Sequence, residues 1–324
     1  MDVKQVYEDL MSMEVGKVIE NEPMYKHTTY KVGGPAKIFV KAKDIDSLIQ
    51  TLKYCRDHDI KHMVIGNGSD LLFSDKEYDG VIISMKSFDD VKMNGSTIVA
   101  QAGVSMIALA YSSAKAGLSG FEFMGGIPGD MGGGIFMNAG AYKYCMADVF
   151  KCARVLDDEL NVITLSKEDM EFSYRHSVLQ KHPNWIILDA TFEMTAKDPG
   201  EIRKVLDKRK ERRMSTQPWN FACAGSVFRN PDEKPAWRYI DEAGLRGYEI
   251  GGAQVSPKHS NFIVNNGYAS AKDILDLIRL VEKTVYEKFG VKLHKEVILV
   301  NWDKIWIRSP IFYSMNMIAA HHVN

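Results

Sequence analysis

The sequence lacks a long apolar run and has almost no excess charge of either sign. No stretch approaches the ~18 apolar residues that a membrane-spanning helix needs. The first 20 residues carry acids early and contain no apolar core segment, so they do not look like a secretory signal peptide. A net charge of −1 argues against a general nucleic-acid or membrane-surface binder, which is usually basic. We therefore expect a cytoplasmic protein with no nucleic-acid or membrane partner.

Cysteine is scarce and follows no pattern. The four cysteines form no C-x-x-C pair, and none stands at zinc-ligand spacing from a histidine. We interpret them as free thiols and expect no metal site. The chain also lacks internal repeats and low-complexity segments. Its 324 residues, 45% of them apolar, are enough to build two or three domains with their own cores.

Apolar periodicity predicts a mixture of helices and strands without strict alternation, which favours an α+β fold class. A change of composition at 215–231 suggests a domain junction. The pattern predicts a hairpin-like pair at 151–157 and 161–165. We expect helices over 1–20, 44–59, 105–118, 198–214, 235–243 and 271–290, and further strands over 36–42, 62–66, 80–84, 97–103, 184–194, near 248–254, and over 261–265 and 292–300.

Glycine is concentrated in two loops. The stretch GGIPGDMGGGIFMNAGAY at 125–142 holds seven glycines and a proline, and VIGNGSDLLF at 64–73 holds a Gly-x-Gly turn after a short strand. The third glycine of a Rossmann fingerprint is missing, because Leu71 stands in its place. Glycine lets a backbone approach a ligand closely and aim consecutive N–H groups at an anion. Two such loops fit a large planar dinucleotide better than a single phosphate.

The two loops therefore predict a site for a large planar dinucleotide cofactor. Asn67, Ser69 and Asn138 would add side-chain donors, and Tyr142 an aromatic ring. The candidate cofactor-binding residues on these loops are Gly66, Asn67, Gly68, Ser69, Asp70, Gly126, Ile127, Pro128, Gly129, Gly132, Gly133, Asn138, Ala139 and Gly140, and Tyr30, Gly33 and Gly34 are candidates to support the same cofactor.

Six segments in order closely resemble the UDP-N-acetylenolpyruvoylglucosamine reductase (MurB) family, in its compact subtype. The resemblance covers roughly residues 22–300. The segments are TTYKVGGPAKIFV (28–40), GNGSDLL (66–72), GIPGDMGGGIFMNAGAY (126–142), YRHS (174–177), AGSVFRNP (224–231) and AGLRGYEIGGAQVSPKHSNFIVN (243–265).

The resemblance implies a two-part FAD-binding domain of the vanillyl-alcohol-oxidase/p-cresol-methylhydroxylase type, followed by a smaller α+β substrate domain. It also implies an oxidoreductase that uses non-covalent FAD, and NADPH as electron donor, to reduce the enolpyruvyl ether of a UDP-sugar in peptidoglycan precursor synthesis. We expect a monomer or weak dimer. The predicted division is an N-terminal helix (1–21), FAD-binding subdomain 1 (22–85), subdomain 2 (86–214), a substrate-binding domain (215–302) and a tail (303–324) on which we place no function.

The resemblance also implies three catalytic residues. Arg175 in YRHS matches the arginine that faces the substrate carboxylate, where a guanidinium fork suits a developing dianion. Ser226 in AGSVF matches the proton donor, and Glu296 matches an acidic partner that acts in its protonated form. For the UDP diphosphate the candidate substrate-binding residues are Gln217, Arg229, Lys258, His259 and Asn261.

Two positions depart from the family pattern. Asp130 stands where a small hydroxyl residue is common, and Lys143 stands where glycine is usual. An acid beside a pyrophosphate would repel it unless the carboxylate points away or caps a helix.

Two other functions stay open on the residues alone. One is an FAD-dependent oxidase of a hydroxy acid or sugar on the same flavin fold. Such oxidases often tether FAD through histidine or cysteine, and neither glycine loop contains a histidine. The other is a non-enzymatic nucleotide-sugar binding module whose loops hold only a diphosphate.

Overall fold

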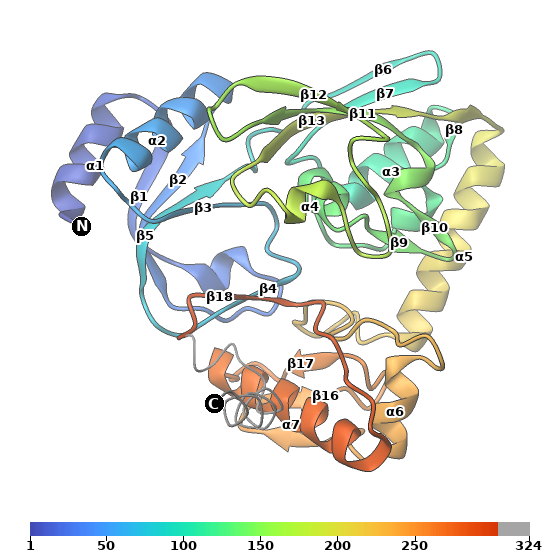
Figure 1. Ribbon diagram of the computed structural model, residues 1–324. Coiled ribbons are helices and arrows are strands. Elements are labelled where there is room, and N and C mark those ends of the chain that lie inside the picture. Colours follow the sequence, from blue (N-terminus) through green and yellow to red (C-terminus); the bar gives the residue numbers. More distant parts are fainter. Residues whose placement is uncertain (304–324) are drawn as a thin grey trace, which may run out of the picture. The chain divides into compact units, whose positions relative to one another are not determined.

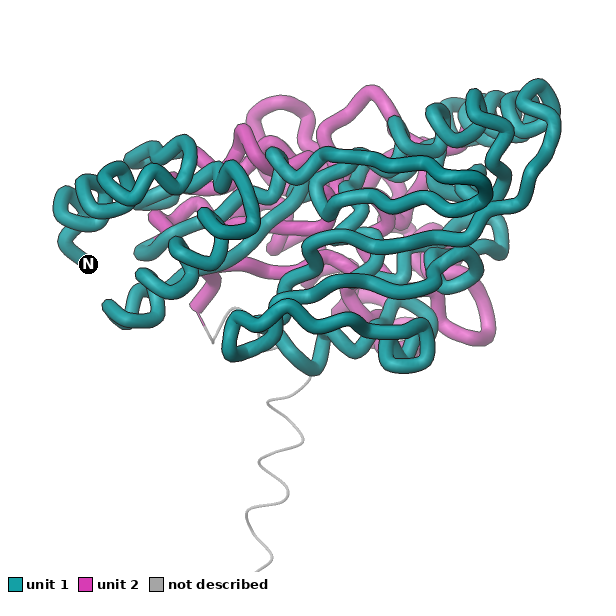
Figure 2. Tube along the Cα trace, turned by 90° about the horizontal axis from the view of Figure 1, so that it is seen from above, with its two compact units in different colours: residues 1–22, 36–68, 79–215 teal, residues 23–35, 69–78, 216–324 magenta. Residues whose placement is uncertain are grey.

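The computed structural model describes residues 1–303, which fall into two compact units. The first comprises residues 1–22, 36–68 and 79–215, and the described part of the second comprises 23–35, 69–78 and 216–303 (Figure 2). The first unit ends at Ser215, where the sequence predicts a junction. Segments 23–35 and 69–78 group with the second unit, although the predicted subdomain 1 includes both. The predicted tail lies outside the described residues, except for Asp303.

The first sheet of the first unit has the strand order β1-β2-β5-β3 (Figure 1). Its strands are β1 (Gly16–Pro23), β2 (Pro35–Ala42), β5 (Tyr78–Ser84) and β3 (His62–Ile65), and its helices are α1 (Val3–Ser12) and α2 (Ile45–Asp57). The prediction of one helix over 1–20 was wrong in its second half. Gly16 has φ +127°, and a Cβ there would lie 2.2 Å from the Lys41 carbonyl oxygen, so only glycine lets β1 approach the next strand.

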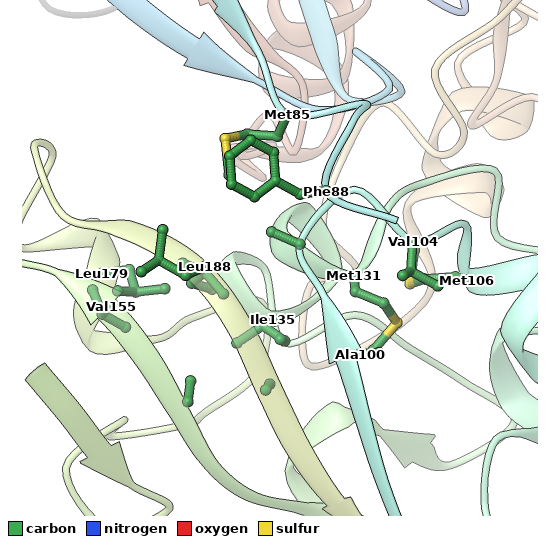
Figure 3. Close-up of a cluster of buried hydrophobic side chains, with 14 of the residues drawn as sticks. Met85, Phe88, Ala100, Val104, Met106, Met131, Ile135, Val155, Leu179 and Leu188 are labelled. Atoms are coloured by element: carbon green, nitrogen blue, oxygen red, sulfur yellow. The ribbon is translucent and has the colours of Figure 1, made fainter. Parts of the chain in front are cut away.

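The second sheet of this unit is antiparallel and has the order β12-β11-β13-β7-β6. The predicted hairpin is confirmed, because Ala153 of β11 pairs with Leu165 of β12. Helix α4 contributes Met131 and Ile135 to the apolar core, which also contains Leu188 of β13 (Figure 3). The elements are β6 (Val91–Asn94), β7 (Thr97–Gln101), β11 (Phe150–Leu156), β12 (Val162–Ser166), β13 (Ile186–Glu193), α3 (Met106–Lys115), α4 (Met131–Phe136) and α5 (Pro199–Thr216).

The second unit has its own core, formed around α7 (Ala271–Phe289). Strands β4 (Leu71–Phe73) and β18 (Ile298–Val300) pair in parallel, and β15 (Glu249–Ile250), β16 (Ala253–Val255) and β17 (Ile263–Asn265) form a small antiparallel sheet. Helix α6 (Ala236–Glu242) completes the unit. The strand predicted over 292–300 begins only at Ile298, because the residues before it make a single bridge, Phe228 to Lys295, instead of a ladder.

The remaining elements are short. They are β8 (Leu118–Ser119), β14 (Thr195–Ala196), β9 (Gly140–Ala141), β10 (Tyr144–Cys145) and the 3₁₀ turns η1 (Met24–His27), η2 (Glu122–Met124), η3 (Met146–Asp148) and η4 (Val178–Gln180). Among residues 1–303 there is no helix with both the length and the apolarity to cross a bilayer. The elements of both units include many helices and many strands, as the α+β prediction requires.

Candidate active site

The Gly66–Gly68 turn follows β3 in the first unit. Gly68 has φ +60°, a conformation that glycine adopts at no steric cost. The Asn67 side chain donates to the Pro128 carbonyl and accepts from the Lys86 ammonium at 2.7 Å. In the part of the chain that the structure describes, the backbone N–H groups of Asn67 and Gly68 donate to no other group. The turn thus presents unpaired donors while its side chain ties it to the second glycine loop.

The second glycine loop leads into α4. The Gly129 carbonyl accepts the Met106 N–H at 3.0 Å, which fixes the loop. Within residues 1–303 the N–H groups of Gly129 and Asp130 have no acceptor in the chain. A Cβ added at Gly133 would meet no described atom within 4 Å. Free amides on both tied loops, with open space beside a helical glycine, fit an anionic dinucleotide such as FAD.

Asp130 is buried at the N-cap position of α4, but its side chain caps no helix N–H. Its carboxylate lies 3.2 Å from the Lys86 ammonium instead. Burial raises the pKa of Asp130, and the neighbouring Lys86 opposes that shift. Lys143, the second departure from the family pattern, has φ +69°, which explains why glycine is usual there.

Arg175 lies at the tip of a turn that joins Ser173 to His176. Its Nη2 donates to the Gly140 carbonyl at 3.2 Å, and its backbone has φ +55°. The Asn138 amide donates to the Ser173 carbonyl at 2.9 Å and so holds the same turn. The first unit therefore brings the predicted Arg175, Asn138 and Gly140 together, with the Asn138 side chain engaged by protein.

Tyr30 belongs to the second unit and is fully buried. No group among the described residues bonds to its phenol oxygen, whereas the Asn265 amide donates to its carbonyl at 3.0 Å. Burial raises the pKa of Tyr30 well above its ordinary value, so the phenol stays protonated and able to donate. A buried hydroxyl without a protein partner needs an explanation, and a ligand contact is one.

Gly33 and Gly34 have a packing reason of their own. A Cβ at Gly33 would lie 2.9 Å from that of Phe73, and one at Gly34 would lie 2.4 Å from the Asp75 carbonyl oxygen. Their predicted role in supporting the flavin stays a prediction, since packing alone accounts for both glycines.

Ser226 and Glu296 lie on two neighbouring segments of the second unit. The Glu296 N–H donates to the Val227 carbonyl at 2.8 Å, and the Arg229 N–H donates to the His294 carbonyl at 2.9 Å. Ser226 directly precedes Val227, so the pairing places the serine and the glutamate close together. Across residues 1–303, the Ser226 hydroxyl bonds to no other group. The Ser226 side chain is half-buried, and its role as proton donor stays a prediction.

The predicted substrate-binding residues also belong to the second unit. Asn261 is buried, and both ends of its amide bond to Phe228, at 3.0 Å to the N–H and 2.8 Å to the carbonyl. Burial lowers the pKa of His259, so the ring is neutral at pH 7. Lys258 is exposed, and Gln217 and Arg229 are half-buried. The Asn261 side chain is thus bonded to protein, and Lys258 lies at the surface.

Two family models match consecutive parts of this chain. Residues 36–166 match an FAD binding domain, and residues 217–300 match the C-terminal domain of UDP-N-acetylenolpyruvoylglucosamine reductase. The first match contains the Gly66–Gly68 turn, the second glycine loop and Lys86. The second match contains Ser226, Asn261 and Glu296. Each match therefore falls on one of the two groups of candidate residues.

Whole-chain relatives agree with these matches. The UDP-N-acetylenolpyruvoylglucosamine reductase of Anoxybacillus flavithermus is 46% identical over 299 residues, which is 92% of this chain and 99% of the relative. That of Bacillus subtilis is 42% identical over 303 residues, or 93% and 100%. The crystal structure of the Thermus caldophilus enzyme superposes with a TM-score of 0.74 at 32% identity, covering 87% of this chain and 98% of that one. The chain belongs to the UDP-N-acetylenolpyruvoylglucosamine reductase family and carries its FAD-binding domain.

Proposed function

We propose that this chain reduces UDP-N-acetylenolpyruvoylglucosamine to UDP-N-acetylmuramate, with one NADPH and one proton consumed for each product formed. The observation that carries the proposal is the pair of glycine loops in the first unit, which are tied to each other and present free backbone N–H groups. The identity of the substrate follows from membership of the family. We place the reaction in the cytoplasm and expect the chain to work as a monomer or weak dimer.

The glycine loops would hold FAD without a covalent bond. The free N–H groups of Asn67, Gly68 and Gly129 would donate to its pyrophosphate, and Gly133 would leave room for a flat ring. The Tyr30 hydroxyl, which has no partner in the described chain, would donate a hydrogen bond to the cofactor. Bound FAD would supply hydride chemistry, which no side chain of the protein can provide.

The chain's own residues handle the charge and the proton. Negative charge develops on the carboxylate-bearing carbon of the substrate when its outer alkene carbon gains a hydride. We propose that Arg175 binds that carboxylate through its guanidinium fork. Ser226 then donates a proton to the charged carbon, and Glu296 polarises the same centre as an acid. Serine is a weak acid, so it suits only a strongly basic carbanion.

Asn261 is better placed to position Ser226 than to touch the substrate. Its amide holds the backbone of Phe228, two residues after the serine. Lys258 would supply positive charge for the UDP diphosphate, with Gln217 and Arg229 as further donors. His259 would act as a neutral hydrogen-bond donor, because burial lowers its pKa.

A two-stage anaerobic assay tests the proposed function. Purified protein should be yellow, and NADPH should bleach its flavin absorbance. Adding UDP-N-acetylenolpyruvoylglucosamine should restore the colour, whereas oxygen should restore it far more slowly. A colourless protein that takes up no FAD would point to the nucleotide-sugar binding module. Rapid recolouring by oxygen, with none by the UDP-sugar, would point to the oxidase.

A further inference from the structure

Lys86 lies between the two glycine loops and contacts both. It follows β5, and its ammonium donates to the Asn67 side chain at 2.7 Å and to the Asp130 carboxylate at 3.2 Å. Asn67 belongs to the first loop and Asp130 to the second. Neither the sequence pattern nor the family resemblance singles out this lysine.

The backbone on both sides of the pair is anchored in the apolar core. Met85 and Phe88 flank Lys86, and both are buried side chains of that core (Figure 3). Met131 follows Asp130 and is buried in the same core. The Met85 N–H donates to the Ile65 carbonyl at 2.9 Å, one residue before the Gly66 turn. Lys86 is therefore held in place at its backbone as well as at its ammonium group.

The two partners differ in their access to solvent. The Asp130 side chain is 2% exposed, whereas that of Lys86 is 39% exposed. A Cβ at Gly66 would lie 3.2 Å from a carboxylate oxygen of Asp130, so the carboxylate packs against the first loop. An ammonium has three N–H bonds, and two of them are directed at Asn67 and Asp130. The open side of Lys86 leaves the third for a ligand.

The surroundings favour an anion as that ligand. The free N–H groups of Asn67, Gly68, Gly129 and Asp130 are on the same two loops that Lys86 joins. Without a cation, the buried carboxylate would repel a phosphate brought to these amides. With Lys86 present the local charge is balanced, and its ammonium is a positive group bonded to both loops.

We propose that Lys86 is an additional cofactor-binding residue, whose ammonium contacts the pyrophosphate of FAD, and that Asp130 is a positioning residue that holds and neutralises it. This inference rests on the proposed function, since it needs FAD at the glycine loops. It differs from an ordinary ion pair in one testable way. A purely structural pair loses the same interaction whichever partner is changed, whereas a cofactor contact makes the two partners unequal.

Four variants separate these possibilities by the Kd of FAD for apo-protein, followed by quenching of flavin fluorescence. Lys86→Met removes the cation and keeps the apolar stem, so the Kd should rise about 10- to 100-fold. Asp130→Asn keeps an oxygen acceptor for Lys86 and removes the negative charge, so the Kd should stay equal or fall. The double variant should bind FAD more tightly than Lys86→Met alone. Lys37→Met is the matched control, because Lys37 pairs with Asp79 at 2.8 Å in the same unit.

Salt dependence and thermal stability give independent readouts. Added salt should weaken FAD binding less in Lys86→Met than in the wild type, because one charge contact is gone. The Tm of each apo-variant shows whether weaker FAD binding is caused by unfolding of the variant. Equal rises in Kd for Lys86→Met and Asp130→Asn would overturn the proposal, as would a Lys86→Met variant that binds like Lys37→Met. A wild-type protein that binds no FAD would instead refute the proposed function.

Discussion

The glycine loops of the first unit and the Ser226–Glu296 segments of the second are built in opposite ways. The loops present backbone N–H groups and are rich in glycine, so substitutions that add side-chain atoms should impair cofactor binding there. The second group presents two side chains from segments that are held by backbone pairing and by Asn261. Substitutions that remove the functional groups of these side chains should therefore impair proton transfer. Cofactor binding and proton transfer should therefore fail separately.

Two helix starts show the same contrast. At α7, Ser270 and Asp273 form a capping box, and the Asp75 carboxylate accepts the next two N–H groups. At α4, the carboxylate of Asp130 is turned to Lys86 and caps nothing. Carboxyls at a helix start thus cap the helix in one unit and balance a cation in the other.

The largest difference between the effects on flavin reduction and on product formation is expected for Ser226→Ala. The variant should still be bleached by NADPH, because the loops of the first unit are untouched. Product formation should fall about 10²- to 10⁴-fold, the usual contribution of a positioned acid. Stopped-flow absorbance follows the two stages in one experiment. Equal loss of both stages would remove Ser226 from the proton-donor role.

Arg175→Ala should come next, with turnover reduced about 10²- to 10³-fold, as for other charge-stabilising donors. Arg175→Lys keeps the charge but not the fork, and should recover only part of the rate. Because Arg175 also bonds to the Gly140 carbonyl, FAD binding must be measured in both variants. Near-normal turnover, or a loss matched by an equal loss of FAD, would contradict the assignment.

Asn261→Leu should destabilise the second unit by about 2–4 kcal/mol, since two buried backbone groups of Phe228 lose their partners. Urea unfolding measures this. Asn261→Asp keeps the acceptor for the Phe228 N–H but sets a carboxylate oxygen against the Phe228 carbonyl, so it should also destabilise the unit, and less so at low pH, where a protonated carboxyl can donate. If Asn261 binds substrate directly, as its sequence context predicts, the KM of the Asn261→Asp variant will rise even under conditions in which urea unfolding shows the variant to be fully folded.

Much of the fold could be predicted from local pattern alone. The hairpin of β11 and β12 follows from alternation around a polar turn, and α7 follows from helical spacing that ends at Gly290, which has φ +67°. The failures are long-range. Gly16 is the one local signal that the first helix ends before β1, and the reason for that glycine, the close Lys41 carbonyl, lies on another strand.

The candidate site divides in the same way. Glycine density alone indicated the two loops, because repeated glycine has few purposes besides close approach. Ser226 and Glu296 are 70 residues apart in the sequence, so only the family resemblance brought them together. Lys86 was missed because a lone lysine after a strand usually faces solvent, and its partner Asp130 lies 44 positions away. The one available signal was the unusual acid in the glycine loop.

Neighbouring glycines of α4 offer a smaller and cleaner test. A Cβ at Gly133 meets no described atom within 4 Å, whereas one at Gly132 would lie 3.0 Å from the Ala102 Cβ. Gly133→Ala should therefore keep or raise the Tm of apo-protein and weaken FAD binding about 10-fold through overpacking against the ligand. Gly132→Ala should lower the Tm. If Gly133→Ala binds FAD normally, the ring does not lie beside α4.

The smallest effect is expected at the start of α7, where Asp273→Asn should cost about 1 kcal/mol of folding stability at neutral pH. Burial alone raises the pKa of Asp273, but hydrogen bonds from Ser270 and from the Gly252 N–H together lower it below its ordinary value. A carboxyl with a lowered pKa in the folded state stabilises the fold above its unfolded pKa of about 4 and loses that contribution as the pH falls through the folded value. The stabilities of variant and wild type should thus differ at pH 7 and converge once the pH has fallen below the lowered pKa of Asp273 in the folded state.

Urea unfolding at several pH values measures this difference, with Asp276→Asn as the control. Asp276 pairs with Lys272 on the surface of the same helix, so its change should have a smaller effect. A difference for Asp273→Asn that stays constant with pH would show that the charge of the carboxyl does not contribute to the capping box. Activity of the first stage, flavin reduction by NADPH, should be unchanged at neutral pH. The stability of the second unit would then vary without any effect on the glycine loops of the first.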